Sequence, residues 1–403
     1  MERVVSVSES SSVPRPPSSK SPASPGFPSH LSQRRSLIAA AGLGLLGAPW
    51  VSRAQSSTLR IATTIASSGV ERFNGLGLLN GAQAYFDAVN RAGGINGRQI
   101  ELVKADDEFN AGKAKDNALK FASDANVLAL IHPQGTRQTT EVMKAVTSLP
   151  IIGPNTGATA LHKSGAKNVF WVRTNYDQEV ERLVKLADNL GLKRFGLVYP
   201  NDPFGQSVLE SFKASLARRN IEAVGIASTP GTASLEVDAA ARQLAKLPVQ
   251  VLIMSLAGTT PAFYKAYRDA GGVSLCYGLS VSGTASNLAQ LAKGNDRPFF
   301  SVIVPSPNAQ KFEIVRQYRR DMKTAGFEID SLVSLEGYVD AYVLAEGLRR
   351  AGAKPDRDSL MAGLESLSNF DIGGVRLNFG KTVREGNHYT DTVTIDAHGR
   401  LIS

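Results

Sequence analysis

The sequence lacks several features that would tie it to a particular class of protein. Its single cysteine, Cys276, allows no disulfide within the chain and is expected to be a small buried side chain. The apolar run from Leu37 to Pro49 is shorter than the about 20 residues that a membrane-spanning helix needs. Lysine and arginine do not cluster with aromatic residues, so nucleic-acid binding has no support. Hydrophobic residues at 42% and charged residues at 20% indicate an ordinary globular protein.

Catalytic and cofactor motifs are missing as well. The sequence contains no G-x-S-x-G nucleophile motif, and the pair Gly75 and Gly77 lacks the rest of a dinucleotide fingerprint. The five histidines show no metal-ligand spacing, and the acidic stretch 106–108 is expected to be a solvated surface loop. We therefore predict no enzyme, no catalytic residue, no cofactor and no metal.

Residues 1–54 differ in composition from the rest of the chain. Positions 1–31 are rich in serine and proline and cannot bury a core. Arg34 and Arg35 then precede the short apolar run, and small residues at Ser52 and Ala54 mark a cleavage site. The segment predicts a disordered leader and a cleavable export signal, suspected to be of the twin-arginine type, with a periplasmic destination. No cysteine stands beside the cleavage site, so a lipid anchor is not expected and the mature product should be freely soluble.

The most informative stretch follows this segment. Leu59 to Ile65 is typical of a strand, and after it a helix is indicated by an apolar stripe at i, i+3, i+4 and i+7. The pair Gly93-Gly94 can end that helix, and Asn96-Gly97 is a strong signal for a tight turn. Gln99 to Lys104 then forms a second strand. Strand, helix and strand in this order predict a parallel βαβ unit. The stripe consists of Ala82, Tyr85, Phe86 and Val89.

The same alternation of strands and helices continues in two series, the first ending near Asn175. Alternation of this kind predicts open parallel sheets covered by helices on both faces, with ligands bound beyond the carboxyl ends of the strands. Prolines at 305 and 307 suggest that the chain crosses back there to the lobe formed by the first series of strands and helices. Further strands are expected at 127–131, 150–152, 195–199, 249–254 and 299–304, and helices at 111–124, 139–148, 178–190, 208–219, 312–325 and 334–351.

Three stretches carry a resemblance to a known family. AVNRAGGINGRQIELVKADDE, at 88–108, closely resembles the N-terminal signature of type I periplasmic solute-binding proteins of ABC importers, in the branched-chain amino acid (Leu/Ile/Val) family. Residues 334–348 and 370–380 resemble two further signatures of that family. The resemblance implies an α/β fold of two Rossmann-like lobes with parallel sheets, joined by a three-crossover hinge that closes on ligand.

The resemblance also implies a domain organisation and partners. We expect lobe 1 at 55–176 plus 307–378 and lobe 2 at 177–306 plus 379–403. The protein is then a monomeric binding component that delivers its ligand to an ABC permease and ATPase. The alternative is a sensor that presents its ligand to a signalling receptor.

Within lobe 1 the resemblance implies two ligand-binding loops. Thr136 stands at the position of a ligand-binding hydroxyl, beside a helix N-terminus that favours a carboxylate. Asn155, Thr156 and Gly157 match the second loop, which would present N–H groups and a hydroxyl to the same carboxylate. The alternatives are that Thr136 only caps its helix and that Thr156 is only a turn residue.

Within lobe 2 the resemblance implies an aromatic wall of the ligand site and a carboxylate that binds the ammonium group of an amino acid ligand. Tyr176 and Phe204 are candidate wall residues, and Asp177 matches the carboxylate that accepts an α-ammonium, unless it only caps a helix. Thr259 lies where the family has aromatic residues. Ser280 lies near a position where amino acid binders carry a glutamate, and this change favours an organic or aromatic acid, or an amide, over an aliphatic amino acid.

Overall fold

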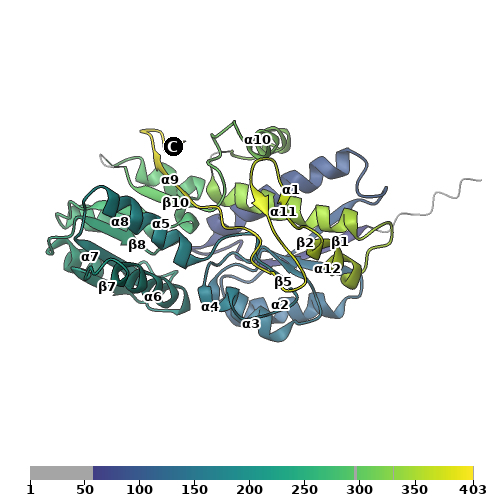
Figure 1. Cartoon of the computed structure of the whole chain (residues 1–403), viewed down its shortest axis with the longest axis horizontal. Coiled ribbons are helices and arrows are strands. Elements are labelled where there is room, and N and C mark those ends of the chain that lie inside the picture. Colours follow the sequence, from purple (N-terminus) through teal and green to yellow (C-terminus); the bar gives the residue numbers. More distant parts are fainter. Residues whose placement is uncertain (1–57, 295–296, 330, 403) are drawn as a thin grey trace, which may run out of the picture. The chain divides into compact units, whose positions relative to one another are not determined.

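The structure is a computed structural model that describes residues 58–294, 297–329 and 331–402. The predicted leader and export signal lie outside these residues. Two sheets, each covered by helices, form two lobes (Figure 1). The two-lobed α/β fold with largely parallel sheets is therefore confirmed. Among the described helices, none is both long and apolar enough to cross a membrane.

The βαβ unit forms as its pattern predicts. Strands β1 (Leu59–Ile65) and β2 (Ile100–Asp106) pair in parallel along their whole length. Helix α1 (Arg72–Arg91) connects them and ends where Gly93 and Gly94 adopt positive φ angles of 101° and 76°. The connection places α1 against one face of the sheet.

A tight turn follows α1. Asn96 and Gly97 have φ angles of 52° and 77°, and Ile95 forms an antiparallel bridge with Arg98. Positive φ at both central residues is the requirement of a type I′ turn, for which Asn-Gly is the preferred pair. The turn signal in the sequence is confirmed.

The first sheet has the order β2-β1-β3-β4-β5, and all its pairs are parallel. Along β1, Leu59 and Ile61 pack with one core cluster and Ala62 with another, because successive side chains of a strand point to opposite faces. The remaining elements of this lobe are β3 (Val127–Ile131), β4 (Ile151–Ile152), β5 (Val169–Phe170), α2 (Ala111–Ser123), α3 (Thr136–Ala145), α4 (Thr159–His162), α10 (Glu313–Ala325), α11 (Leu332–Arg350), α12 (Arg357–Glu365) and the hairpin of β11 (Phe370–Asp371) and β12 (Arg376–Leu377).

The second sheet has the order β14-β13-β10-β9-β8-β6-β7, in which β13 pairs antiparallel with both β10 and β14 and the remaining pairs are parallel. Cys276, on β9, is buried in its core as predicted. The elements are β6 (Phe195–Pro200), β7 (Gly225–Thr229), β8 (Val251–Met254), β9 (Leu275–Gly278), β10 (Phe299–Val302), β13 (Asp391–Ile395), β14 (Leu401–Ile402), α5 (Tyr176–Asn189), α6 (Pro203–Ala217), α7 (Asp238–Ala245), α8 (Thr260–Asp269), the short 3-10 helix η1 (Ser280–Ser282) and α9 (Ala285–Leu291).

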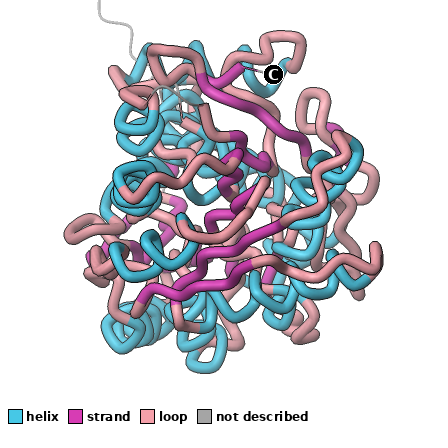
Figure 2. Tube along the Cα trace, turned by 90° about the vertical axis from the view of Figure 1, so that its left-hand side faces the viewer, coloured by secondary structure: helices cyan, strands magenta, loops and turns pink. Residues whose placement is uncertain are grey.

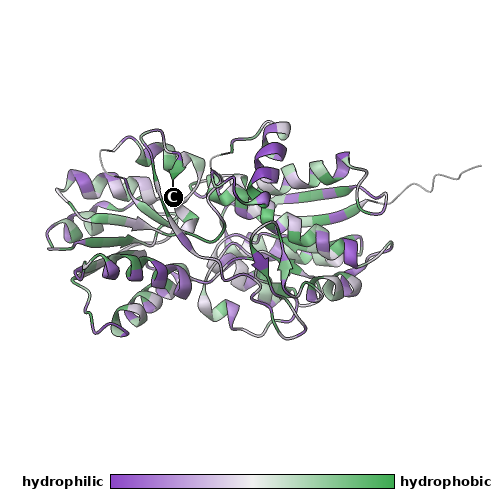
Figure 3. Ribbon diagram, turned by 45° about the horizontal axis from the view of Figure 1, so that its top comes forward, coloured by the Kyte–Doolittle hydropathy of each residue, from purple (hydrophilic) through white to green (hydrophobic). Residues whose placement is uncertain are grey.

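The sheets lie inside the layers of helices. Figure 2 shows the strands crossing the interior of the trace with helices around them, and Figure 3 shows hydrophobic strands beneath helices that carry hydrophilic residues. Burial of the apolar sheet faces is the main favourable term in folding, at about 25 cal/mol per Å² of apolar surface.

Three chain crossings connect the lobes and lie next to each other. The first runs from β5 to α5, the second from β10 to α10, and the third from β12 to β13. Trp171 of the first crossing forms a parallel bridge with Glu385 of the third, and the Asn387 side chain donates to the Ile303 carbonyl oxygen at 3.1 Å. These contacts form a hinge, which includes the crossing that the prolines indicated.

Four helices begin earlier than the sequence predicts, α11 at Leu332 and three others that bear on the ligand site. Helices α3, α5 and α6 were expected at 139, 178 and 208 but begin at Thr136, Tyr176 and Pro203. Their first turns carry few residues of the apolar stripe, so periodicity misses them. As a result Thr136, Tyr176 and Phe204 all lie in a first helical turn.

Candidate functional site

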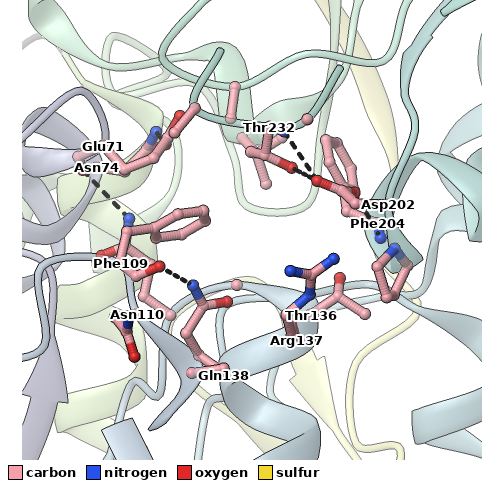
Figure 4. Close-up of a pocket in the computed structure, with 18 of the residues that line it drawn as sticks. Glu71, Asn74, Phe109, Asn110, Thr136, Arg137, Gln138, Asp202, Phe204 and Thr232 are labelled. Atoms are coloured by element: carbon pink, nitrogen blue, oxygen red, sulfur yellow. Dashed lines mark hydrogen bonds between the residues drawn. The ribbon is translucent and has the colours of Figure 1, made fainter. Parts of the chain in front are cut away.

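A cavity of about 560 Å³ lies between the two lobes (Figure 4). Its lining comes from the segments that follow the carboxyl ends of strands in both sheets, where ligands of open α/β sheets bind. Lobe 1 contributes the segments after β1, β2, β3 and β4, and lobe 2 those after β6, β7, β8 and β9. A molecule in this cavity would contact both lobes.

The N-terminus of α3 opens into the cavity. Gly135 precedes this helix with a φ of 91°, and a Cβ there would lie 2.5 Å from Gln138 Oε1, so glycine is required. The next two residues, Thr136 and Arg137, both line the cavity. The first N–H groups of a helix have no partner within it and carry partial positive charge. The turn therefore presents hydrogen-bond donors to the cavity.

The side chains of this turn add to those donors. Thr136 Oγ1 lies 2.7 Å from Thr156 Oγ1, and α3 has no side-chain cap, so Thr136 does not act as one. The Arg137 side chain is exposed in the cavity and forms no hydrogen bond or ion pair with another described residue. An unpaired guanidinium beside a helix N-terminus suits an anionic group.

The second predicted loop of lobe 1 supports this turn from behind. Asn155 lines the cavity, and its Nδ2 donates to Glu336 Oε1 at 3.1 Å. Thr156 is buried beneath Thr136 and is not part of the cavity wall. The Gly157 carbonyl accepts from the Tyr176 N–H at 2.7 Å, and a Cβ on Gly157 would lie 2.7 Å from the Tyr176 ring. Gly157 therefore sets the position of Tyr176.

Tyr176 and Phe204 form an aromatic wall on lobe 2. Both line the cavity, and their ring centroids are 5.2 Å apart. Burial raises the pKa of Tyr176 to about 12, so its hydroxyl stays protonated at neutral pH. Phe204 is held by Asp202, whose Oδ1 accepts from the Phe204 and Gly205 N–H groups at the start of α6.

Three other predicted site residues do not line the cavity. Asp177 accepts from Ser211 Oγ at 2.6 Å, and Asn175 caps α5 in its place. Thr259 is buried, and its hydroxyl donates to the Thr232 carbonyl oxygen at 3.4 Å. The Ser280 hydroxyl accepts from Arg173 Nη2 at 3.0 Å. Their ligand-binding roles remain predictions.

Arg173 is the centre of a buried charge cluster at the hinge. It donates to Glu179 on α5 at 2.8 Å and to Glu336 on α11 at 3.1 Å, and so connects the two lobes. Burial opposes the charge of Arg173, but these carboxylates hold its pKa above the usual value. Burial also raises the pKa of Glu336 to about 7. Asn155 links this cluster to the cavity.

A buried pair of histidine and aspartate lies beside the charge cluster within lobe 1. His132 Nδ1 lies 2.9 Å from Asp340 Oδ2, and both side chains are buried. Burial lowers the pKa of His132 to about 3 and raises that of Asp340 well above its usual value. Both shifts have the same cause, because burial disfavours the charged form of each group.

The acidic loop after β2 is only in part the solvated surface that the sequence indicates, since Asp106 and Glu108 are exposed. Asp107 is buried and accepts from Thr64 Oγ1 at 3.1 Å, and burial raises the pKa of Asp107 to about 6. The expectation is wrong for this residue because Asp107 bonds to the end of β1, through Thr64 and through its own N–H to the Ile65 carbonyl oxygen. Within the described ranges no cluster of His, Cys, Asp and Glu could hold a metal ion.

Several residues of the cavity were not predicted from the sequence. They are Glu71 and Asn74 at the start of α1, Phe109 after β2, Arg137 on α3 and Asp202 before α6. Their positions in the sequence carried a signal, because each residue lies in a segment that follows the carboxyl end of a strand, where ligands of such sheets bind. The side-chain direction was not available from the sequence.

Glu71 is the lining residue that reaches across the cleft. Its Oε1 accepts from the Gly258 N–H of lobe 2 at 3.0 Å, and its Oε2 accepts from Asn74 Nδ2 at 2.9 Å. The side chain is buried, and this burial raises the pKa of Glu71 to about 7 against the effect of its two hydrogen bonds. The Glu71–Gly258 bond connects the two lobes beside the cavity.

Comparisons with known proteins agree with this architecture. A family model described as periplasmic binding protein matches residues 58–400. The Leu/Ile/Val-binding protein BraC3 of Rhizobium johnstonii is 23% identical over 315 residues, which are 75% of this chain and 82% of that protein. A solved substrate-binding periplasmic protein from Ralstonia solanacearum is 27% identical with a TM-score of 0.79, covering 85% of this chain and 99% of that one.

A further solved structure shows likeness of fold alone. It is an ABC transporter solute-binding protein from R. palustris in complex with benzoate, 19% identical with a TM-score of 0.76, covering 86% of this chain and 95% of that one. The resemblance drawn from the three sequence signatures is thus confirmed, as is the expectation that the chain is not an enzyme. Because the family model matches most of its length, the chain belongs to the periplasmic binding protein family, whose members bind solutes.

Proposed function

We propose that this protein is the binding component of an ABC importer and captures a small carboxylate-bearing solute in the cavity between its lobes. The observation that carries the proposal is the Arg137 side chain, which lies unpaired in the cavity beside Thr136 and the first turn of α3. Guanidinium, hydroxyl and helix N–H groups together suit a carboxylate.

The rest of the cavity favours a solute with an apolar or aromatic body. Phe109, Tyr176 and Phe204 line it, and aromatic rings bury large apolar surfaces. At about 560 Å³ the cavity falls within the roughly 300 to 1,000 Å³ range of small-molecule sites. Organic acids, aromatic acids, amino acids and their amides all remain candidates, and the benzoate held by the R. palustris protein supports the acid class.

The location and partners follow from the family. Its name implies the periplasm, where the closed protein would deliver solute to a permease and an ATPase. Lobe closure around ligand is the expected mode of capture. The twin-arginine route, the monomeric state and the lobe boundaries given above remain part of the proposal.

Calorimetry with a panel of carboxylic acids tests the proposal. Arg137→Gln should weaken binding of the best acid by about 1.5 to 3 kcal/mol, the range for a hydrogen bond to a charged group. Lys144→Gln is the matched control, because it removes a positive charge from the other end of α3, outside the cavity. Equal binding by wild type and Arg137→Gln, or no binding of any acid, would contradict the proposal.

A further inference from the structure

We infer that Glu71 and Asn74 form a second subsite, which takes a cationic nitrogen group of the ligand. The ligand would then be an elongated zwitterion, with its carboxylate at Arg137 and an ammonium or guanidinium at Glu71. The inference rests on the proposed function for the carboxylate end. Figure 4 shows Glu71 and Asn74 across the cavity from Thr136 and Arg137.

Glu71 has acceptor capacity left for a ligand. A carboxylate offers about four lone-pair sites. Two of them are used in the structure, by the Gly258 N–H and by Asn74 Nδ2. The side chain lines the cavity although only 1% of its surface is exposed, so a ligand there would meet a desolvated carboxylate. Ion pairs with such groups are stronger than those in water.

Asn74 supplies an independent sign of a missing donor. Its Nδ2 donates to Glu71 Oε2 at 2.9 Å. This orientation leaves Asn74 Oδ1, which is buried and has no hydrogen-bond partner among the described residues. Buried acceptors without a partner are rare in folded proteins. The Glu71 carboxylate and Asn74 Oδ1 therefore both favour a ligand group that has hydrogen-bond donors and no acceptor, such as an ammonium.

The charges of the cavity lining also favour a cation at this end. Its charged residues are Glu71, Asp202 and Arg137. Asp202 already accepts from two N–H groups of α6 and, through Oδ2, from the Thr232 N–H at 2.8 Å and hydroxyl at 2.6 Å. Glu71 is thus the carboxylate with the greater need of a counter-ion. A plain acid would leave it unpaired, at a cost in free energy.

An apolar spacer fits between the two ends. In Figure 4 the Phe109 ring lies between the Glu71 pair and Arg137. Phe109 has a φ of 58°, and its carbonyl accepts from Gln138 Nε2 at 2.6 Å. Such strained backbone persists only where surrounding contacts hold it, often at ligand-binding sites. The Phe109 ring would cover the middle of the ligand.

Calorimetry with matched pairs of probes tests the inference. One set compares ω-amino acids of increasing chain length with fatty acids of the same length, and the other compares para-aminomethylbenzoate with para-toluate. We expect at least one zwitterion to bind about tenfold or more tightly than its matched acid, the gain from a charged hydrogen bond. Glu71→Gln should abolish that difference.

Two further variants complete the test. Glu101→Gln removes the same charge from the surface of lobe 1, away from the cavity, and should preserve the preference for the zwitterion. Asn74→Leu should reduce the preference, and melting curves establish that each variant folds. Equal binding of each zwitterion and its matched acid to wild type would overturn the inference and leave the proposed function standing. If no probe of either kind binds, both fail.

Discussion

At the scale of single residues, Glu71 should make stability depend on pH. Its pKa is raised from 4.5 to about 7 by burial and, to a smaller extent, by Asp202, against the bonds from Asn74 and Gly258. An acid with a raised pKa in the folded state gives its full stabilisation below pH 4.5 and loses it as pH rises through 7. The shift corresponds to about 3 kcal/mol at most.

The measurement compares wild type with Glu71→Gln, both without ligand, at pH 5 and pH 8. We expect the free energy of unfolding of Glu71→Gln, relative to that of wild type, to be higher at pH 8 than at pH 5. Asp107 and Glu336, with pKa values of about 6 and about 7, titrate in the same pH range in both proteins. Their contributions therefore cancel in the comparison, and the contribution of Glu71 is left. An identical difference at both pH values would show that Glu71 does not titrate in this window.

Thr136 and Thr156 should act on the ligand as a coupled pair. Thr136→Ala should weaken acid binding by about 1.5 to 3 kcal/mol, because a hydroxyl that can bind a charged group is lost. Thr156→Ala should weaken it less, since Thr156 lies outside the cavity wall and reaches the ligand site through its 2.7 Å contact with Thr136. A double-mutant cycle by calorimetry checks this, and additive effects would rule the coupling out.

At the scale of elements, the hinge depends on Arg173 between α5 and α11. Arg173→Leu would leave Glu179 and Glu336 buried without their counter-ion. We expect a loss of about 3 to 5 kcal/mol in the free energy of unfolding, measured with denaturant. Arg182→Leu is the control, because its pair with Asp391 is partly exposed and should cost less than about 1 kcal/mol. Equal losses would contradict this account.

At the scale of the whole molecule, closure depends on close contact at Gly258. A Cβ at this position would lie 2.9 Å from both Glu71 Oε1 and the Val70 carbonyl oxygen of lobe 1. Gly258→Ala should therefore hold the lobes apart and weaken every ligand, whatever its chemistry. Small-angle scattering should show a smaller contraction on binding than in wild type.

The control for closure is Gly380→Ala, where the nearest atoms to an added Cβ are 3.8 Å away on Val383. This variant should contract like wild type. Full contraction of Gly258→Ala at saturating ligand would show that the contact does not limit closure.

The sequence by itself determined the local elements and their order. The apolar stripe of α1, the turn at Asn96-Gly97 and the alternation of strands and helices depend on neighbours a few residues apart, and their physical causes are local. The order of elements then placed Thr136, Asn155, Tyr176 and Phe204 at the cavity, because loops after parallel strands meet at one edge.

Only the tertiary structure decided which side chains face the cavity and which hold the hinge. Ser280 looked like an altered ligand site, but its hydroxyl binds Arg173, which lies 107 positions away in the sequence. Glu71 contacts Gly258 across 187 positions, and no local pattern encodes such a pairing. The direction of each side chain depends on the packing of two lobes, and that packing exists only once the chain has folded.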